Sequence, residues 1–182
     1  IPHLSARMIP DRVKLAELLA RARDAGLTQV FVVGGDADEP GEYLDGLSLI
    51  RAMVGIGHPF ATIGCPAYPQ GHPDIPDAAL AQALRDKAPY VAHVTTQMDF
   101  DTKAIAAWVR ARRAEGFAPA VVVGVPGVAD PQKLLNIAAR IGVKDAKRFL
   151  LKNLRFVTGL ARGLADGQRV DVALTAIPGA EY

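Results

Sequence analysis

Polar and aromatic side chains that could do chemistry follow several short apolar runs in this sequence. Asp36 comes after a run that ends in Gly34 and Gly35, and Tyr68 and His72 lie in a proline-rich segment after the next run. Gln97 closes a third run. Carboxylate, phenol, imidazole and amide groups can all hydrogen-bond a ligand. Their recurrence at the ends of apolar runs indicates a ligand site.

Each of these residues also has a structural explanation. Asp36 after two glycines suits an ordinary turn, because Gly and Asp both favour turns. Tyr68 and His72 could shape their own loop. The Gln97 amide needs hydrogen-bonding partners wherever it is buried, whether or not a ligand supplies them. Residue types alone therefore leave structural and functional roles open.

The elements that must position these residues alternate between strands and helices. Apolar or β-branched runs predict strands, and spacings of three and four predict helices. The predicted strands cover 28–33, 60–65, 90–96, 120–125 and 170–176, with His3-Leu4-Ser5 as the end of an earlier one. The predicted helices cover Asp11 to Gly26, 43–54, 77–87, 102–115, 131–141 and 145–164.

Specific caps and faces follow from the same spacing. We expect Asp11 and Asp101 to cap their helices by accepting backbone N–H groups. In the first helix, Leu15, Leu18, Leu19 and Ala22 fall at helical spacing. In the second, Leu44, Leu47, Ile50 and Val54 are expected on one face. Cys65, within a predicted strand, reads as a small core residue.

Strands that are apolar on both faces and alternate with helices predict a parallel sheet. Two α/β architectures fit, an open doubly wound sheet and a (β/α)8 TIM barrel. No G-x-G-x-x-G follows the first strand, so the dinucleotide-binding open sheet lacks its main signature. A typical barrel needs about 250 residues, and this chain opens on Ile1-Pro2-His3 without an initiator Met. We expect one barrel domain over residues 1–182 with its first strands absent. In either architecture, ligands bind at the carboxyl ends of the strands.

Composition narrows the functional classes. The 182 residues are 50% hydrophobic and 22% charged, with a formal net charge of +2. Basic residues are scattered rather than gathered on one face, so we expect no nucleic-acid partner. No apolar stretch is long enough to span a membrane, and we expect no membrane association. The single cysteine, Cys65, cannot form an internal disulfide, which fits a reducing compartment such as the cytoplasm. A homo-oligomer remains compatible with the sequence.

Five short motifs carry a family resemblance. They are Pro2-His3-Leu4, Gly35-Asp36, Ala67-Tyr68-Pro69 with His72-Pro73, Thr96-Gln97 before Phe100-Asp101, and Pro126-Gly127. In this order and approximate spacing, from His3 to about Asn153, the chain resembles the methylenetetrahydrofolate reductases of the bacterial single-domain type. The resemblance implies a (β/α)8 barrel that holds FAD across the carboxyl ends of its strands. It also implies reduction of 5,10-methylenetetrahydrofolate to 5-methyltetrahydrofolate by NADH or NADPH, in one-carbon metabolism and methionine biosynthesis.

The resemblance also assigns roles to individual residues. Asp36 matches the catalytic aspartate near flavin and folate, where a carboxylate favours the cationic form of the substrate. Gly34 and Gly35 would let the backbone approach the flavin ring, and Gln97 would hydrogen-bond the pterin. The other matched flavin-contacting positions are His3, Tyr68, His72 and Lys87, with the Lys87 charge placed near the pyrophosphate. His58 and His93 show no metal-ligand spacing, so we expect no metal site.

Three departures from the family pattern support competing functions. Gly34 stands where the family often has an arginine, and Leu80 and Ala83 stand where it has polar groups toward the FAD. A divergent member that binds folate or flavin weakly, as a partner or regulatory subunit, is therefore the alternative. An unrelated barrel lyase or aldolase is a third possibility, although no strand end carries an obvious Schiff-base lysine.

Overall fold

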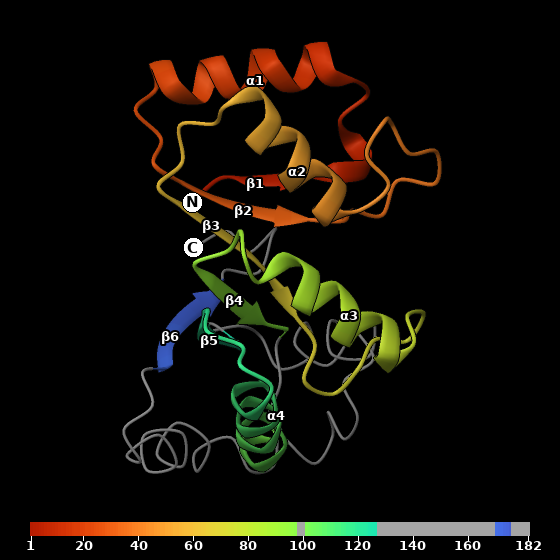
Figure 1. The fold of residues 1–182 in the computed structure, drawn as a ribbon, viewed down its shortest axis with the longest axis vertical. Helices are drawn as coiled ribbons and strands as arrows, with labels where there is room; N and C mark the ends of the chain where they lie inside the picture. Colours follow the sequence, from red (N-terminus) through yellow and green to blue (C-terminus); the bar gives the residue numbers. More distant parts are fainter. Residues whose placement is uncertain (98–100, 127–169, 176–182) are drawn as a thin grey trace. The chain divides into compact units, whose positions relative to one another are not determined.

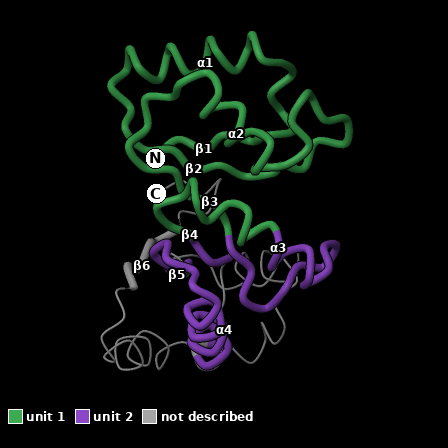
Figure 2. Tube along the Cα trace, viewed as in Figure 1, with its two compact units in different colours: residues 1–66, 83–94 green, residues 67–82, 95–182 purple. Residues whose placement is uncertain are grey.

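The computed structural model describes residues 1–97, 101–126 and 170–175 (Figure 1). The chain forms two compact units, the first from Ile1–Pro66 and Ala83–Val94, the second from Ala67–Gln82 and Thr95–Tyr182 (Figure 2). The predicted helices 131–141 and 145–164 lie outside the described residues.

The first unit begins with two parallel strands and the helices that follow them. Its elements are β1 (His3–Ser5), the 3-10 helix η1 (Ala6–Met8), α1 (Arg12–Asp24), β2 (Gln29–Val33), α2 (Gly46–Ile56) and most of β3 (Thr62–Ala67). His3 pairs with Phe31 and Ser5 with Val33, and Phe31 pairs in turn with Gly64. The side chains of β1, β2 and β3 are therefore aligned row by row.

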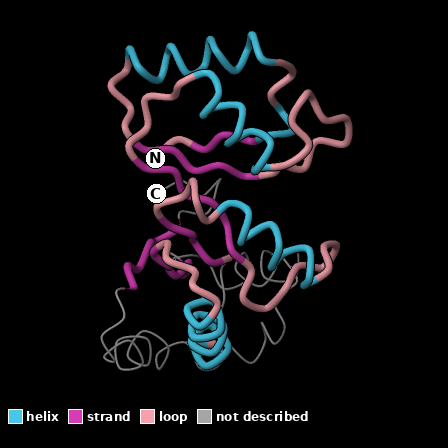
Figure 3. Tube along the Cα trace, viewed as in Figure 1, coloured by secondary structure: helices cyan, strands magenta, loops and turns pink. Residues whose placement is uncertain are grey.

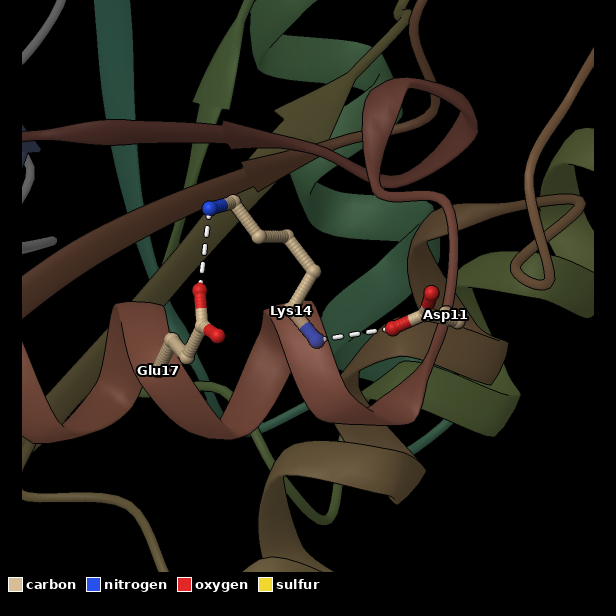
Figure 4. Close-up of polar contacts among 3 residues, drawn as sticks. All are labelled: Asp11, Lys14 and Glu17. Atoms are coloured by element: carbon tan, nitrogen blue, oxygen red, sulfur yellow. Dashed lines mark hydrogen bonds and ion pairs between the residues drawn. The ribbon is translucent and has the colours of Figure 1, made fainter.

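Helix α1 begins where the sequence predicts. The Asp11 carboxylate accepts a hydrogen bond from the Lys14 backbone N–H at 2.7 Å, and Lys14 pairs with Glu17 on the next turn (Figure 4). The predicted cap is confirmed. Leu15, Leu19 and Ala22 are buried, whereas Leu18 is only half-buried.

Helix α2 begins three residues later than the predicted helix 43–54. It starts at Gly46 because Asp45 caps it, and the Ser48 side chain reaches back to complete a capping box. Leu44 precedes this start and is 64% exposed, so its predicted place on the helical face is wrong, whereas the predicted Ile50 is buried. The buried face contains Leu49 and Met53 beside Ile50, and Val54 is 49% exposed.

The core of the first unit lies between β2 and the two helices, which cover one side of β1 and β2 (Figure 1). Val30 and Val32 are buried, and a β-carbon at Gly46 of α2 would lie 3.6 Å from Val32 Cγ1. Each fully buried aliphatic side chain contributes about 1.5 to 3 kcal/mol. Because side chains alternate along a strand, Phe31 points to the opposite face, away from α2.

Both units share α3 (Asp77–Lys87) and β4 (His93–Thr96), and the second also contains α4 (Thr102–Ala114), β5 (Ala120–Pro126) and β6 (Val170–Thr175). Figure 3 distinguishes the helices and strands of the chain by colour. The predicted helices 77–87 and 102–115 are confirmed. Asp101 caps α4 by accepting from the N–H groups of Lys103 and Ala104. The last predicted strand is also confirmed, since β6 pairs in parallel with β5 from Val121↔Val170 to Pro126↔Thr175.

The strands follow one another in chain order. Hydrogen bonds in the described part of the chain give the sequence β1-β2-β3-β4-β5-β6. A doubly wound sheet reverses its strand order at a switch point, and these six strands show no such reversal. The arrangement is therefore that of an incomplete (β/α)8 barrel. No helix in the described segments is both long and apolar enough to cross a lipid bilayer.

Candidate active site

The loop after β2, residues 34–45, carries the predicted catalytic aspartate and is called here the Asp36 loop. Gly35 has φ 91°, and a β-carbon there would overlap the Ser5 hydroxyl, so only glycine suits this position. A β-carbon at Gly34, by contrast, would meet no described atom within 4 Å. No described atom therefore crowds this side of Gly34, and its close approach to a flavin stays a prediction.

Asp36 presents its carboxylate to solvent. The residue is exposed, and its side chain makes no hydrogen bond or ion pair with any residue that the structure describes. Its backbone, however, lies between two anchored neighbours. Gly34 O accepts a hydrogen bond from the Arg7 N–H at 2.9 Å, and Ala37 O accepts one from Arg7 Nε at 2.8 Å.

The far end of the Asp36 loop is tied to the segment that follows η1. Gly41 N–H donates to Arg7 O at 3.0 Å, and Glu42 N–H donates to Pro10 O at 2.9 Å. The Glu42 carboxylate in turn accepts from the Arg12 N–H at 2.8 Å. Tyr43 is buried at the end of the loop, and burial raises the pKa of its phenol, with the Glu42 charge adding to the shift.

His3 lies in the first unit at the start of β1, not at the end of its strand as predicted. The strand extends to Ser5 because Leu4 and Ser5 pair with Val32 and Val33. The His3 ring is exposed and lies 4.9 Å from the ring of Phe31. His3 therefore lies two residues before the strand end, on the face opposite to α2.

Phe31 extends this contact into a row of three rings that sequence reasoning missed. His93 on β4 lies 6.3 Å from Phe31, measured between ring centroids. Gly64, between them on β3, makes the contact possible, since a β-carbon there would overlap the His93 imidazole. Burial lowers the pKa of His93, so its ring is neutral at neutral pH. A glycine in an otherwise apolar strand was the available signal, because such a glycine often marks a close approach.

Lys87 ends α3, and its charge acts on Cys65 of β3. Burial raises the pKa of the Cys65 thiol to about 11, and the nearby Lys87 charge opposes this rise. Cys65 is fully buried, as predicted for a small core residue. The predicted role of Lys87 near a pyrophosphate stays a prediction.

The second unit contains the loop after β3, residues 68–76, called here the His72 loop. The rings of Tyr68 and His72 meet edge to face with centroids 5.2 Å apart. His72 Nδ1 accepts a hydrogen bond from the Asp74 N–H at 3.1 Å. A neutral ring held this way carries its proton on Nε2, which makes that atom a donor.

Gln97 follows β4 in the second unit. Its backbone N–H donates to Ala67 O at 2.8 Å, which aligns the ends of β3 and β4. The neighbouring Thr96 is buried, and its hydroxyl accepts the Gly124 N–H of β5 at 3.0 Å. Gln97 is thus fixed at a strand end, where the sequence predicts it.

The predicted site residues are divided between the two compact units. The first unit holds His3, Gly34, Gly35, Asp36 and Lys87, and the second holds Tyr68, His72 and Gln97. Their joint site stays a prediction. The described residues contain no group of three or more His, Cys, Asp or Glu side chains able to hold a metal ion.

Comparison with known protein families agrees with the resemblance found in the motifs. The sequence profile of the family described as methylenetetrahydrofolate reductase matches residues 1–151. The match includes all eight predicted site residues and both loops described above. The chain therefore belongs to the methylenetetrahydrofolate reductase family, whose fold is a (β/α)8 barrel and whose activity is that of an oxidoreductase acting on methylenetetrahydrofolate.

Proposed function

We propose that this protein reduces 5,10-methylenetetrahydrofolate to 5-methyltetrahydrofolate with NADH or NADPH as the hydride donor and FAD as its cofactor. The family match over residues 1–151 supports the reaction class. When bound, FAD supplies a two-electron carrier between the nicotinamide and the folate. The observation that carries the proposal is the exposed, unpaired carboxylate of Asp36 on a backbone anchored on both sides.

Asp36 is the proposed catalytic residue. The reacting folate develops positive charge as an iminium ion, and a fixed carboxylate nearby stabilises that charge electrostatically. A carboxylate that already pairs with a lysine or arginine would contribute less, because its charge would be offset. Asp36 has no such partner among the described residues, so its full charge is available to the substrate.

We assign cofactor binding to residues of both units. For each residue the assignment depends on a local feature of its surroundings. Gly34 offers an open backbone, and the exposed His3 ring, backed by Phe31, offers a flat surface. His72 offers an Nε2 donor, and Tyr68 packs against its ring. Lys87 supplies the positive charge proposed for the pyrophosphate.

Gln97 is the proposed pterin-binding residue. A pterin edge presents donors and acceptors side by side, and a primary amide can pair with both. The backbone bond from Gln97 to Ala67 holds the residue at its strand end. This placement favours a binding role over a catalytic one.

The test begins with the colour of the purified full-length protein. Bound FAD should give absorbance at about 450 nm. Under anaerobic conditions, NADH or NADPH beyond the one equivalent that reduces the flavin should be oxidised only when 5,10-methylenetetrahydrofolate is present. Colourless protein that takes up no added FAD would contradict the proposal and favour a partner or regulatory subunit, the alternative that Gly34, Leu80 and Ala83 motivate. Turnover without any reduced nicotinamide would favour a lyase or aldolase instead.

A further inference from the structure

We infer that Arg7 is a positioning residue that fixes the Asp36 loop and thereby aims the Asp36 carboxylate. This inference rests on the proposed function, because it assigns Arg7 a role through Asp36. Arg7 belongs to η1 and lies 30 residues before Ala37, so the two segments meet only in the folded chain.

Arg7 contacts the Asp36 loop through four groups. Its backbone N–H donates to Gly34 O at 2.9 Å, and its carbonyl accepts from the Gly41 N–H at 3.0 Å. Its guanidinium donates from Nε to Ala37 O at 2.8 Å and from Nη2 to Asp38 O at 3.2 Å. The side chain thus holds the backbone just after Asp36, and the main chain holds Gly34 before it and Gly41 farther along the loop.

The geometry requires an arginine. Two donors in a rigid, planar fork reach two consecutive carbonyl oxygens, Ala37 O and Asp38 O. A lysine ammonium is a single point of charge on a flexible stem, and it cannot reproduce this fork. Both carbonyls would lose a charge-assisted hydrogen bond in Arg7→Met, and one of them would lose it in Arg7→Lys.

The guanidinium engages carbonyl oxygens and leaves the Asp36 carboxylate unpaired. A direct Arg–Asp ion pair would fix the carboxylate but would also offset the negative charge that a cationic substrate needs. By holding the neighbouring carbonyls, Arg7 restricts the backbone of Asp36 without neutralising its side chain. Arg7 therefore acts as a positioning residue and not as a catalytic one.

The experiment compares Arg7→Met and Arg7→Lys with a matched control, Arg23→Met. Arg23 also donates from its guanidinium to a distant carbonyl, Gly57 O at 3.0 Å, but outside the Asp36 loop. In FAD-loaded full-length protein, both Arg7 variants should slow folate reduction about tenfold or more. Oxidation of NADH should change less than about twofold in the same variants. The control should leave both rates within the same limit.

Two further readouts separate positioning from general damage. In the Asp36→Asn background, Arg7→Met should slow folate reduction no further, because the group that Arg7 aims is already altered. In protein without folate, hydrogen exchange of the amides at 36–39 and at Gly41 should accelerate in Arg7→Met and stay unchanged in Arg23→Met. Unchanged exchange in the Asp36 loop would overturn the inference whatever the rates.

The outcomes distinguish this inference from the proposed function. If Asp36→Asn slows folate reduction and Arg7→Met does not, the role of Arg7 is wrong and the proposed function stands. If Arg7→Met slows both half-reactions equally, or adds its full effect to that of Asp36→Asn, Arg7 acts independently of Asp36 and the inference fails. If Asp36→Asn leaves folate reduction unchanged, the proposed role of Asp36 fails, and the positioning role fails with it.

Discussion

The Asp36 loop and the His72 loop both follow parallel strands, but they are held in different ways. The Asp36 loop is joined to residues 7–12 by bonds between groups about 30 positions apart. The His72 loop contains bonds between close neighbours, from Asp74 N to His72 Nδ1 and from Gly71 N to Tyr68 O, and Tyr68 and Gln70 make further interactions. A carboxylate that must stabilise a developing charge needs a fixed position, whereas a ligand-contacting loop needs only a suitable local shape. The difference suggests separate tasks for the two loops.

The largest expected contrast in stability is between Gly41→Ala and Gly71→Ala. A β-carbon at Gly41 would overlap Ile9 O and lie 2.7 Å from Pro10 Cα, both of them backbone atoms that cannot rotate away. We expect Gly41→Ala to lower the free energy of unfolding by about 3 kcal/mol. At Gly71 the nearest atom is Asp77 Oδ1 at 2.8 Å, which can move, so the cost should be the positive φ alone, about 1 to 2 kcal/mol.

Urea denaturation followed by circular dichroism measures both losses. Gly55→Ala is the control, because Gly55 lies in α2 and a β-carbon there meets nothing within 4 Å. It should be neutral or stabilise by up to about 1 kcal/mol. Equal losses at Gly41 and Gly71 would mean that the Asp36 loop is no more tightly held than the His72 loop.

Gln97→Ala tests whether Gln97, unlike the proposed catalytic residue Asp36, acts in substrate binding alone. Loss of the amide would remove the hydrogen bonds that we propose to the pterin, so folate should bind about tenfold more weakly. The rate of NADH oxidation by FAD-loaded protein should stay the same. Gln29→Ala, on the exposed start of β2, is the matched control. Calorimetric titration with folate measures the two affinities. Equal affinities for Gln97→Ala and the wild type would show that Gln97 does not bind the folate.

The smallest expected effect is on the pH dependence of stability, through His93 in the row of rings with His3 and Phe31. Burial lowers the pKa of His93 from its ordinary value of 6.5. The unfolded chain therefore binds this proton more readily than the folded one. The stability that the neutral ring contributes is present above pH 6.5 and is lost as the pH falls toward the lower folded pKa. His93→Gln should reduce the difference in urea midpoint between about pH 5 and about pH 7.5. A pH dependence identical to that of wild type would show that His93 does not titrate on unfolding.

Local signals in the sequence predicted much of the fold. Asp11 and Asp101 were recognisable as caps because a carboxylate three residues before a helical backbone N–H acts within one turn. The bounds of α3 match the predicted 77–87, and β6 pairs where a last strand was predicted. Leu44 shows the limit of periodicity, since a capping box at Asp45 moved the helix start beyond it.

The site was less accessible to sequence reasoning than the fold. Strand ends identified Asp36 and Gln97 as candidates, because parallel topology places strand ends at the ligand-binding edge. The four bonds of Arg7 gave no comparable signal, since their partners lie about 30 residues away and are backbone atoms of any residue type. The ring row of His3, Phe31 and His93 likewise depends on strand register, which no local pattern specifies.

The central claim is that the anchored carboxylate of Asp36 acts on the folate. Rapid mixing of FAD-loaded Asp36→Asn with NADH, and separately of the prereduced variant with 5,10-methylenetetrahydrofolate, measures the two half-reactions. We expect folate reduction to slow by about 100-fold or more, since the variant removes a fixed charge from the transition state, while NADH oxidation should change far less. Equal slowing of both half-reactions, or no slowing of either, would contradict the account.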